Sequence, residues 1–473
     1  MNTQCTTEQL FFQGLGTRKV VGCFDGGTLT SDAGALLLRE VDRARNIFEA
    51  FSSCFVDYRD PRYVEHTVRE LIAQRTVGIC LGYEDVNDHD ELRRDPLLAT
   101  VCGKLDPSGA DRRTERDRGC ALAGKSTLNR LETYGVGKEE HWKYKKICYA
   151  EQEIDQFFVD MFVKNHRKAP TEIILDVDAT DDPLHGDQEG RYFHGYFDCY
   201  CYLPLYIFCG DELLYAKLKT ADVDPGNESL LDIQKVVERI RERWPEVRIV
   251  LRGDSGFCRD GLMSWCERNG VFYIFGMAKN TRLRKRIEKE LKKVRKRYYL
   301  QGRKPQRIYK EFYYRTRDSW SRRRRVIGKA EYMVQGENPR FVVSNLERES
   351  MPPRELYEEL YCGRGDMENR IKEQQLYLFS DRTSSATMGA NQLRLYFSSL
   401  AYVLMSELRR RALKGTEFAK AQCHTIRLKL LKIGAQVRVS VRRISVSFAS
   451  SYPYQGIFIQ VLANLKRAYP QLC

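Results

Sequence analysis

The stretch between residues 171 and 277 constrains the fold most, because short apolar runs of strand length alternate there with amphipathic runs of helical period. Three strand-like runs come first: strands at residues 171–178, 200–209 and 212–219, then a helix at 229–243, a strand at 248–252, a helix at 260–268 and a strand at 271–277. Gly210-Asp211 is typical of a hairpin turn between the second and third runs. This order predicts an α/β fold in which an antiparallel meander continues through helical crossovers into parallel strands.

Two of the predicted strands end in aspartate. Asp178 ends the first strand, with Asp176 on the same strand face, and Asp254 follows the fourth strand. In a sheet of this order the two strands are neighbours, so their carboxylates repel unless a cation lies between them. Hard oxygen ligands favour Mg²⁺ or Mn²⁺, which can activate a nucleophile for in-line phosphoryl transfer. Asp176 is an alternative to Asp178 as the first ligand, and Asp254 alone also suits an ordinary Asp-Ser-Gly turn.

A predicted long helix over residues 355–379 supplies a third acid. Four functional side chains fall on one face of this helix: Tyr361, Arg364, Glu368 and Lys372. The alternative is a solvent face in which Glu368 pairs with Arg364 or Lys372. Gly363 and Gly365 interrupt the helix, which is tolerable if it begins at Asp366 or if its backbone approaches DNA closely.

The positive charge is concentrated in one segment. Residues 279–329 contain 22 Lys and Arg against 4 Asp and Glu, whereas the whole chain has a net charge of +15. Interleaved aromatic residues favour phosphate contact with base stacking over a solvated tail. The run expected to contact DNA is Arg322, Arg323, Arg324 and Arg325.

The first 168 residues are predicted to form a mainly helical DNA-binding domain. Residues 122–132 are similar to the second half of a helix-turn-helix, with Gly124 in the turn and Lys125, Asn129 and Arg130 facing DNA. An ordinary capped helix explains the same pattern equally well.

Other classes of protein are disfavoured. The N-terminus lacks a signal-peptide pattern and no apolar run reaches the length of a membrane span, so a cytoplasmic, nucleoid-associated location is expected. Fifteen scattered cysteines favour free thiols, and Cys199 with Cys201 lacks the partners of a zinc site. His185 and His194 lack the spacing of a metallohydrolase, so loop or core roles are expected.

With these motifs together, the chain resembles bacterial insertion-sequence DDE transposases, and within them transposase DDE domain group one, the insertion-sequence family thirteen-eighty. The resemblance covers roughly residues 20–460 and rests on Asp-Ala-Thr at Asp178, Gly-Asp-Ser-Gly-Phe at Asp254 and Tyr-x₂-Arg-x₃-Glu ending at Glu368. Longer strings add to it: Asp181-Asp-Pro-Leu-His-Gly186, Gln188-Glu-Gly-Arg191, Arg364-Gly-Asp-Met-Glu-Asn-Arg-Ile-Lys-Glu373 and Ala390-Asn-Gln-Leu-Arg-Leu395.

The resemblance implies catalytic metal-binding acids at Asp178, Asp254 and Glu368 with bound Mg²⁺ or Mn²⁺. It also implies phosphate or flipped-base contacts by Tyr361 and Arg364, double-stranded DNA as partner, and a homodimer in the synaptic complex. The wider signature has a lysine seven residues after the glutamate, where this chain has Gln375, so Lys372 is expected to substitute.

The predicted architecture is therefore a ribonuclease-H-like core with a strand-rich insertion. The expected segments are an N-terminal domain at 1–168, the first part of the core at 169–279, a basic insertion at 280–352, the second part of the core at 353–410 and a C-terminal region at 411–473. The expected function is a transposase that binds its inverted repeats, cuts and joins DNA. The alternatives are a nuclease that cuts without joining and a non-catalytic DNA-binding protein.

Overall fold

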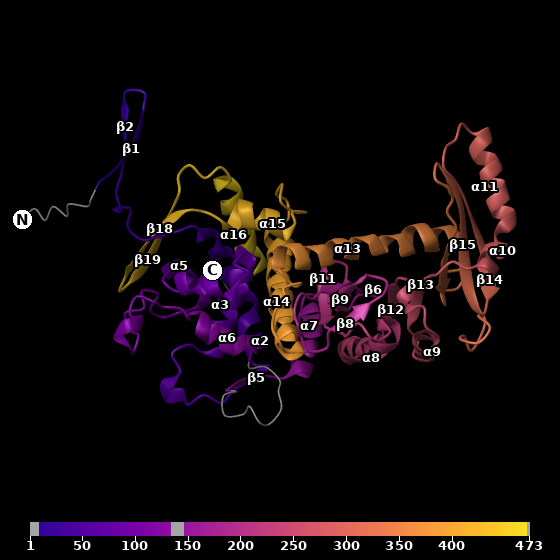
Figure 1. Cartoon of the computed structure of the whole chain (residues 1–473), viewed down its shortest axis with the longest axis horizontal. Coiled ribbons are helices and arrows are strands. Elements are labelled where there is room, and N and C mark those ends of the chain that lie inside the picture. The colour runs from indigo at the N-terminus through magenta and orange to yellow at the C-terminus, as the bar shows by residue number, and fades with distance from the viewer. Residues whose placement is uncertain (1–8, 134–145, 471–473) are drawn as a thin grey trace, which may run out of the picture. The chain divides into compact units, whose positions relative to one another are not determined.

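The computed structural model describes residues 9–133 and 146–470, which fold into two compact units (Figure 1). The first unit comprises Met1–Glu132, Tyr144–Ile147 and Leu404–Cys473, and the second comprises Thr133–Lys143 and Cys148–Val403. The division of the chain into five segments stays a prediction. Among the helices within the described ranges, none is both long and apolar enough to cross a membrane.

The first unit is mainly helical. Its helices are α1 (Leu36–Arg45), α2 (Ile47–Ser52), α3 (Val68–Leu81), α4 (His89–Leu92), α5 (Pro96–Cys102), α6 (Lys125–Thr133), α15 (Cys423–Ile426) and α16 (Gln455–Ala468). Its strands include a hairpin of β1 (Leu10–Leu15) with β2 (Arg18–Gly22), and a sheet of β3 (Leu29–Thr30), β18 (Ala435–Ser440) and β19 (Arg443–Phe448). Helix α3 begins at a capping box, because the Thr67 hydroxyl accepts from the Glu70 amide while the Glu70 carboxylate accepts from the Thr67 amide.

The second unit is built on a nine-stranded mixed sheet, so the chain has a mixed α/β fold. Its strands are β6 (Glu172–Ala179), β10 (Leu205–Cys209), β11 (Glu212–Lys217), β12 (Arg248–Gly253), β13 (Phe272–Met277), β14 (Gln306–Tyr314), β15 (Arg324–Met333), β16 (Gly336–Glu337) and β17 (Arg340–Ser344). The spatial order is β11-β10-β6-β12-β13-β17-β15-β14, with β16 paired to β15. Strands β6, β12 and β13 are mutually parallel, and their neighbours on both sides are antiparallel to them.

The seven elements predicted between residues 171 and 277 occur in the expected order, with one difference. The run at 200–209 is divided into β9 (Cys199–Tyr202) and β10, because Pro204 has no amide to donate to a sheet ladder. Strand β9 instead pairs with β7 (Asp182–Pro183) and β8 (Tyr192–His194) in a separate small sheet. The Gly210-Asp211 hairpin is confirmed, since Cys209 pairs with Glu212 across it.

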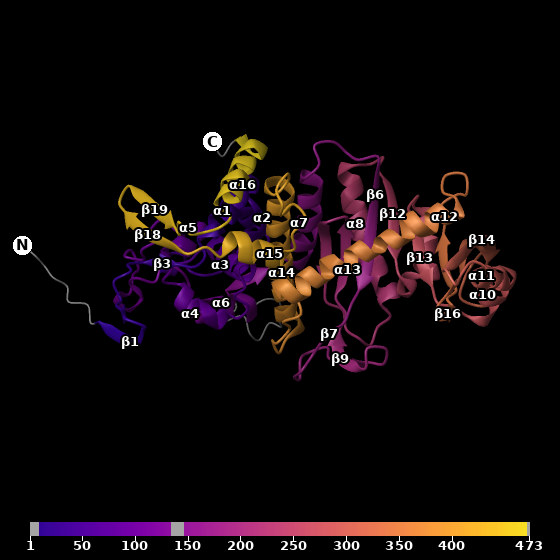
Figure 2. The same cartoon turned by 90° about the horizontal axis from the view of Figure 1, so that it is seen from above.

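Helices cover both faces of the large sheet. Helices α8 (Pro225–Arg243) and α9 (Asp260–Arg268) pack on the face to which Leu175, Val177 and Leu251 point. A helical segment from Pro353 to Tyr377 runs across the other face, over β6, β12 and β13 (Figure 2). Helices α7 (Glu151–Lys164) and α14 (Met388–Ala412) are the remaining long helices of this part of the chain.

The basic segment contributes strands that extend the large sheet. Strands β17, β15 and β14 continue the ladder beyond β13. Residues 281–300, for which no helix was predicted, form α10 (Thr281–Arg286) and α11 (Glu288–Leu300). Buried residues recur there at helical spacing, and four of them join the sheet core: Leu283, Ile287, Leu291 and Val294. Tyr298 is buried one turn further along. The many intervening Lys and Arg residues obscured this pattern in the sequence.

Candidate active site

Two aspartates lie at the same edge of the sheet because β6 and β12 are parallel neighbours. Asp178 is near the carboxyl end of β6, and the pairing of Val177 with Gly253 places Asp254 directly beyond the end of β12. Asp254 also begins a short 3₁₀ turn, because its Oδ1 accepts a hydrogen bond of 2.8 Å from the Gly256 amide. Asp254 therefore both starts the predicted turn and lies at the same edge of the sheet as Asp178. We call this edge the acidic edge.

Arg364 links Asp178 to the third acid. Its Nη1 lies 3.2 Å from Asp178 Oδ2 and its Nη2 lies 2.9 Å from Glu368 Oε1. Burial raises the pKa of Asp178 to about 7; Arg364 opposes this rise, whereas the charges of Asp254 and Glu368 add to it. One guanidinium thus serves as the counterion of a group of three carboxylates.

The donor chemistry of this group fits a divalent cation, since carboxylate oxygens are the ligands that Mg²⁺ and Mn²⁺ prefer. In the conformation seen, no three His, Cys, Asp or Glu side chains of the described residues already converge as a metal-binding group. Arg364 occupies the space between Asp178 and Glu368. The Glu368 side chain is about half exposed, so a metal held by both acids would have to displace the guanidinium that now links them.

Asp176 is held by a different partner. Both of its carboxylate oxygens accept from Arg252, at 2.5 Å from Nε and 2.7 Å from Nη2, and both side chains are buried. The two residues lie opposite one another in the β6–β12 register. Because this charge is already neutralised, the geometry favours Asp178 over Asp176 as a ligand.

Arg252 also ties the sheet to the helical segment that carries Arg364 and Glu368. Its Nη1 donates a 2.6 Å hydrogen bond to the Leu360 carbonyl. That carbonyl lies in a π-helical turn, Leu356–Tyr361, which is followed by a 3₁₀ turn, Cys362–Arg364, before α13 (Gly365–Lys372) begins. The sequence interpretation missed Arg252; the available signal was an arginine two residues before Asp254, on a strand expected to lie beside Asp176.

The predicted helix interruption is present, and the structure gives its reason. A Cβ atom at Gly363 would lie 2.5 Å from Arg252 Nη1, whereas a Cβ at Gly365 would meet no atom within 4 Å. The close approach at Gly363 is thus to a side chain of the sheet, and an approach to DNA stays a prediction. A side chain at 363 would displace Arg252, whereas one at 365 would meet open space.

Tyr361 and Lys372 occupy different surroundings. The half-buried Tyr361 ring packs against Tyr357, with 5.5 Å between ring centroids, and its hydroxyl lies 2.6 Å from where a Cβ of Gly276 would be. Burial raises the Tyr361 pKa, Arg364 opposes the rise, and Asp254 adds to it. Lys372 is exposed, while Gln375 donates a 3.1 Å hydrogen bond to the Asp181 carbonyl.

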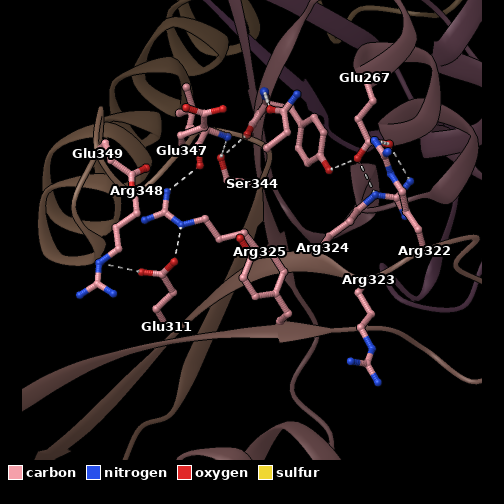
Figure 3. Close-up of a pocket in the computed structure, with 14 residues that line it drawn as sticks. Glu267, Glu311, Arg322, Arg323, Arg324, Arg325, Ser344, Glu347, Arg348 and Glu349 are labelled. Carbon is pink, nitrogen blue, oxygen red and sulfur yellow. Dashed lines mark hydrogen bonds and ion pairs between the residues drawn. The ribbon is translucent and has the colours of Figure 1, made fainter.

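The arginine run lies at the opposite edge of the sheet, which we call the arginine edge. Arg325 pairs with Ser344 near the end of β17, and Ser344 lies opposite Ile274 in the first half of β13. A cavity of about 680 Å³ opens here, lined by four arginines of the run and by acids such as Glu267 and Glu311 (Figure 3).

The four arginines of the run differ in burial. The Arg324 side chain is 2% exposed and pairs with Asp260 at 2.6 Å and Glu267 at 2.8 Å. Arg325 is 4% exposed and pairs with Glu311 at 3.0 Å. Arg322 is largely exposed and also pairs with Glu267, whereas the exposed Arg323 lies apart from these acids (Figure 3). Two of the four predicted DNA contacts are therefore buried ion-pair partners.

Helix α6 supports the ordinary-helix alternative. Lys125, Asn129 and Arg130 are exposed, while Leu128 and Leu131 are buried. The preceding α-helix, α5, ends at Cys102, so the short turn of a helix-turn-helix does not occur. The three polar residues point outward as predicted, but the α-helix that should precede them in a helix-turn-helix motif is absent at residues 103–124.

The two histidines and the two closely spaced cysteines named in the sequence have the following surroundings. His194 packs against Phe197, with ring centroids 5.0 Å apart, and His185 is exposed. Cys199 and Cys201 are free thiols, and burial raises the pKa of Cys201 to about 12.

Comparison with known families gives a match that spans nearly the whole chain. A family described as "Transposase DDE domain group 1" matches residues 12–470. No curated protein matches the chain.

Proposed function

Because this chain belongs to the transposase DDE domain group 1 family, we propose that it is a DNA transposase that binds the inverted repeats of its own insertion sequence. It cleaves DNA there and joins the freed ends to a target, using divalent metal at Asp178, Asp254 and Glu368. The proposal extends to membership of the insertion-sequence family thirteen-eighty and to a ribonuclease-H-like core. The strand order β11-β10-β6-β12-β13 supports that core.

The observation that carries the proposal is the charge imbalance at the acidic edge. Asp178, Asp254 and Glu368 act electrostatically on one another, and Arg364 alone bridges two of them. Neighbouring carboxylates that outnumber the cations beside them repel one another. They stay ionised at neutral pH only if a further cation binds between them. A divalent ion with bound DNA phosphate meets that requirement.

The protein side chains divide the work. Asp178, Asp254 and Glu368 would hold the metal, which when bound activates a water or DNA 3′-hydroxyl and stabilises the leaving oxygen. Arg364, released from its carboxylates, can bind a phosphate with two parallel hydrogen bonds. Tyr361 lies about one helical turn before Arg364 and positions the DNA strand near Asp254.

Further DNA contacts are proposed on exposed side chains. Arg322, Arg323 and Lys372 offer cations in the second unit, and Lys125, Asn129 and Arg130 offer an exposed polar face in the first. A homodimer is proposed for the synaptic complex, in which two transposon ends are joined.

The test is a strand-transfer assay with Mg²⁺ and DNA that carries the inverted repeats flanking the gene. Asp178→Asn, Asp254→Asn and Glu368→Gln should each lower cleavage by about a thousandfold or more, roughly 4 kcal/mol in activation free energy. DNA binding should persist, because each change keeps the side-chain shape. Glu359→Gln, an exposed glutamate on the same helical segment, is the matched control and should retain full activity.

Three outcomes would contradict the proposal or part of it. Normal Mg²⁺-dependent cleavage by any one of the three variants removes that residue from the site. Cleavage without joined products by the parent protein favours the nuclease alternative, and binding without either reaction favours the non-catalytic one.

A further inference from the structure

Helices α10 and α11 carry a strong excess of positive charge on an exposed surface. Between residues 281 and 300 they contain ten Lys and Arg residues, and the only acids there are Glu288 and Glu290. Both acids are already paired: Glu288 with Lys292 at 2.9 Å and Glu290 with Lys310 at 3.0 Å.

Three lysines form a row on the side of α11 that faces away from the sheet. Lys289, Lys293 and Lys296 have spacings of four and three, so they share one helix face, opposite the buried face that includes Leu291 and Val294. All three are exposed, and their side chains make no ion pair or hydrogen bond within residues 9–133 and 146–470. We call them the lysine row.

The helix that carries the row is fixed to the sheet and projects from its acidic edge. Strand β13 ends at Met277 beside the end of β12, so Lys279 and the start of α10 lie at the same edge as Asp254. Near Ile287, α11 meets Gly328 of β15, and near its end Tyr298 packs on Tyr332, with 5.0 Å between ring centroids.

Tyr332 lies three residues beyond the last pairing of β15 with β17, which joins Lys329 to Arg340. The helix therefore runs alongside β14 and β15, beyond β13 in the order of the sheet (Figure 1). The helix thus starts level with the acidic edge, on β15, which lies three strands along the sheet from β12.

A hollow of about 780 Å³ adjoins the same helices. It is lined by five cations and by two acids that are already paired: Lys279, Arg284, Lys285, Lys292 and Arg295, with Glu288 and Glu337. The charge beside the row is therefore positive as well, and the two acids in the lining do not balance it.

We infer that the lysine row binds the phosphate backbone of duplex DNA flanking the cleavage site, without reading its sequence. The inference rests on the proposed function for the nature of the partner. Seven residues of helix span about 10 Å, comparable with about three base pairs of duplex at 3.4 Å each. Flexible lysines that project from a rigid helix give charge contact without base-specific geometry.

The test measures affinity for a duplex of arbitrary sequence against salt concentration, with no divalent metal present. Lys289→Gln/Lys293→Gln/Lys296→Gln should reduce the slope of log affinity against log salt by about 2.7, at about 0.9 for each phosphate that the variant no longer neutralises. The control is Lys235→Gln/Arg243→Gln/Arg268→Gln, which removes the same charge from exposed positions on α8 and α9. It should leave the slope near that of the parent.

The inference is overturned if the slope is unchanged in the row variant, or if both triple variants lower it equally. It is also overturned if only binding to a single strand of the same length is weakened. Cleavage at saturating DNA should be normal in the row variant, so KM changes and kcat does not. Because the binding test needs no metal, its failure leaves the catalytic proposal standing, whereas a parent protein that binds no DNA contradicts the proposed function itself.

Discussion

The two edges of the large sheet both carry concentrated charge, but they balance it differently. At the arginine edge Arg324 and Arg325 are buried against Asp260, Glu267 and Glu311. At the acidic edge one guanidinium bridges two of three neighbouring carboxylates, Asp178 and Glu368. A run of charge in the sequence marks only the arginine edge, and there the fold pairs the buried arginines with acids, whereas at the acidic edge the carboxylates outnumber the one guanidinium that bridges them.

The largest expected effect concerns stability at the arginine edge. Arg324→Ala should lower the free energy of unfolding by about 3–5 kcal/mol, because it leaves the Asp260 and Glu267 carboxylates without their buried partner. Arg323→Ala, at the exposed neighbouring position, should change it by about 0.5 kcal/mol or less. Urea unfolding of both variants measures the difference. If both variants change the free energy of unfolding by the same small amount, the ion pairs of Arg324 do not stabilise the arginine edge, and the contrast with the acidic edge is wrong.

A smaller effect is expected where the sheet holds the helical segment that carries Arg364 and Glu368. Gly363→Ala places a methyl group against Arg252 and should cost about 1–3 kcal/mol of stability, as overpacking does. It should also slow DNA cleavage, because the Leu360 tether and Arg364 must shift. Gly365→Ala is the matched control, since its Cβ meets open space, and it should be neutral or stabilising by up to about 1 kcal/mol. Full activity in Gly363→Ala would show that the tether does not position the acids.

The smallest effect sharpens the role of Arg364 as resident counterion. Without DNA, Arg364→Gln should bind Mn²⁺ about tenfold more tightly than the parent, roughly 1.4 kcal/mol, because no guanidinium competes for Asp178 and Glu368. With DNA, the same variant should slow strand transfer more than first-strand nicking, since phosphate positioning is lost. Titration calorimetry and single-turnover kinetics measure the two effects. Unchanged Mn²⁺ affinity together with unchanged rates would leave Arg364 a simple helix pair.

The elements between residues 171 and 277 could be predicted because each is determined by the residues within it or next to it. Apolar runs, the Gly210 hairpin and helical spacing each fix one element between residues 171 and 277. The features that could not be predicted depend mainly on pairing between segments far apart in the sequence. The addition of β14, β15 and β17 to the sheet follows from pairing that no local pattern records. The helices of the basic segment do leave a local pattern, the helical spacing of Leu283, Ile287, Leu291 and Val294, but the many Lys and Arg residues between them obscured it.

The candidate site shows the same limit. The strand ends at Asp178 and Asp254 predicted a shared edge, and the helix face predicted that Arg364 and Glu368 lie together. Their catalytic roles stay predictions. The pairing of Asp176 with Arg252 depends on the register of two strands. The burial of Arg324 and Arg325 depends on acids elsewhere in the chain, so the run of arginines suggested DNA contact at two positions where the structure has buried ion pairs.

Metal-directed cleavage of the protein backbone tests the central claim most directly, because it locates the metal without requiring transposition. With Fe²⁺ in place of Mg²⁺, together with ascorbate and peroxide, radicals form at the bound ion and cut the nearby chain. Cuts are predicted near Asp178, Asp254 and Glu368, with loss of all three in Asp178→Asn and suppression by excess Mg²⁺. Cuts that fall instead at the arginine edge, or that persist unchanged in Asp178→Asn, would contradict a metal site at the acidic edge.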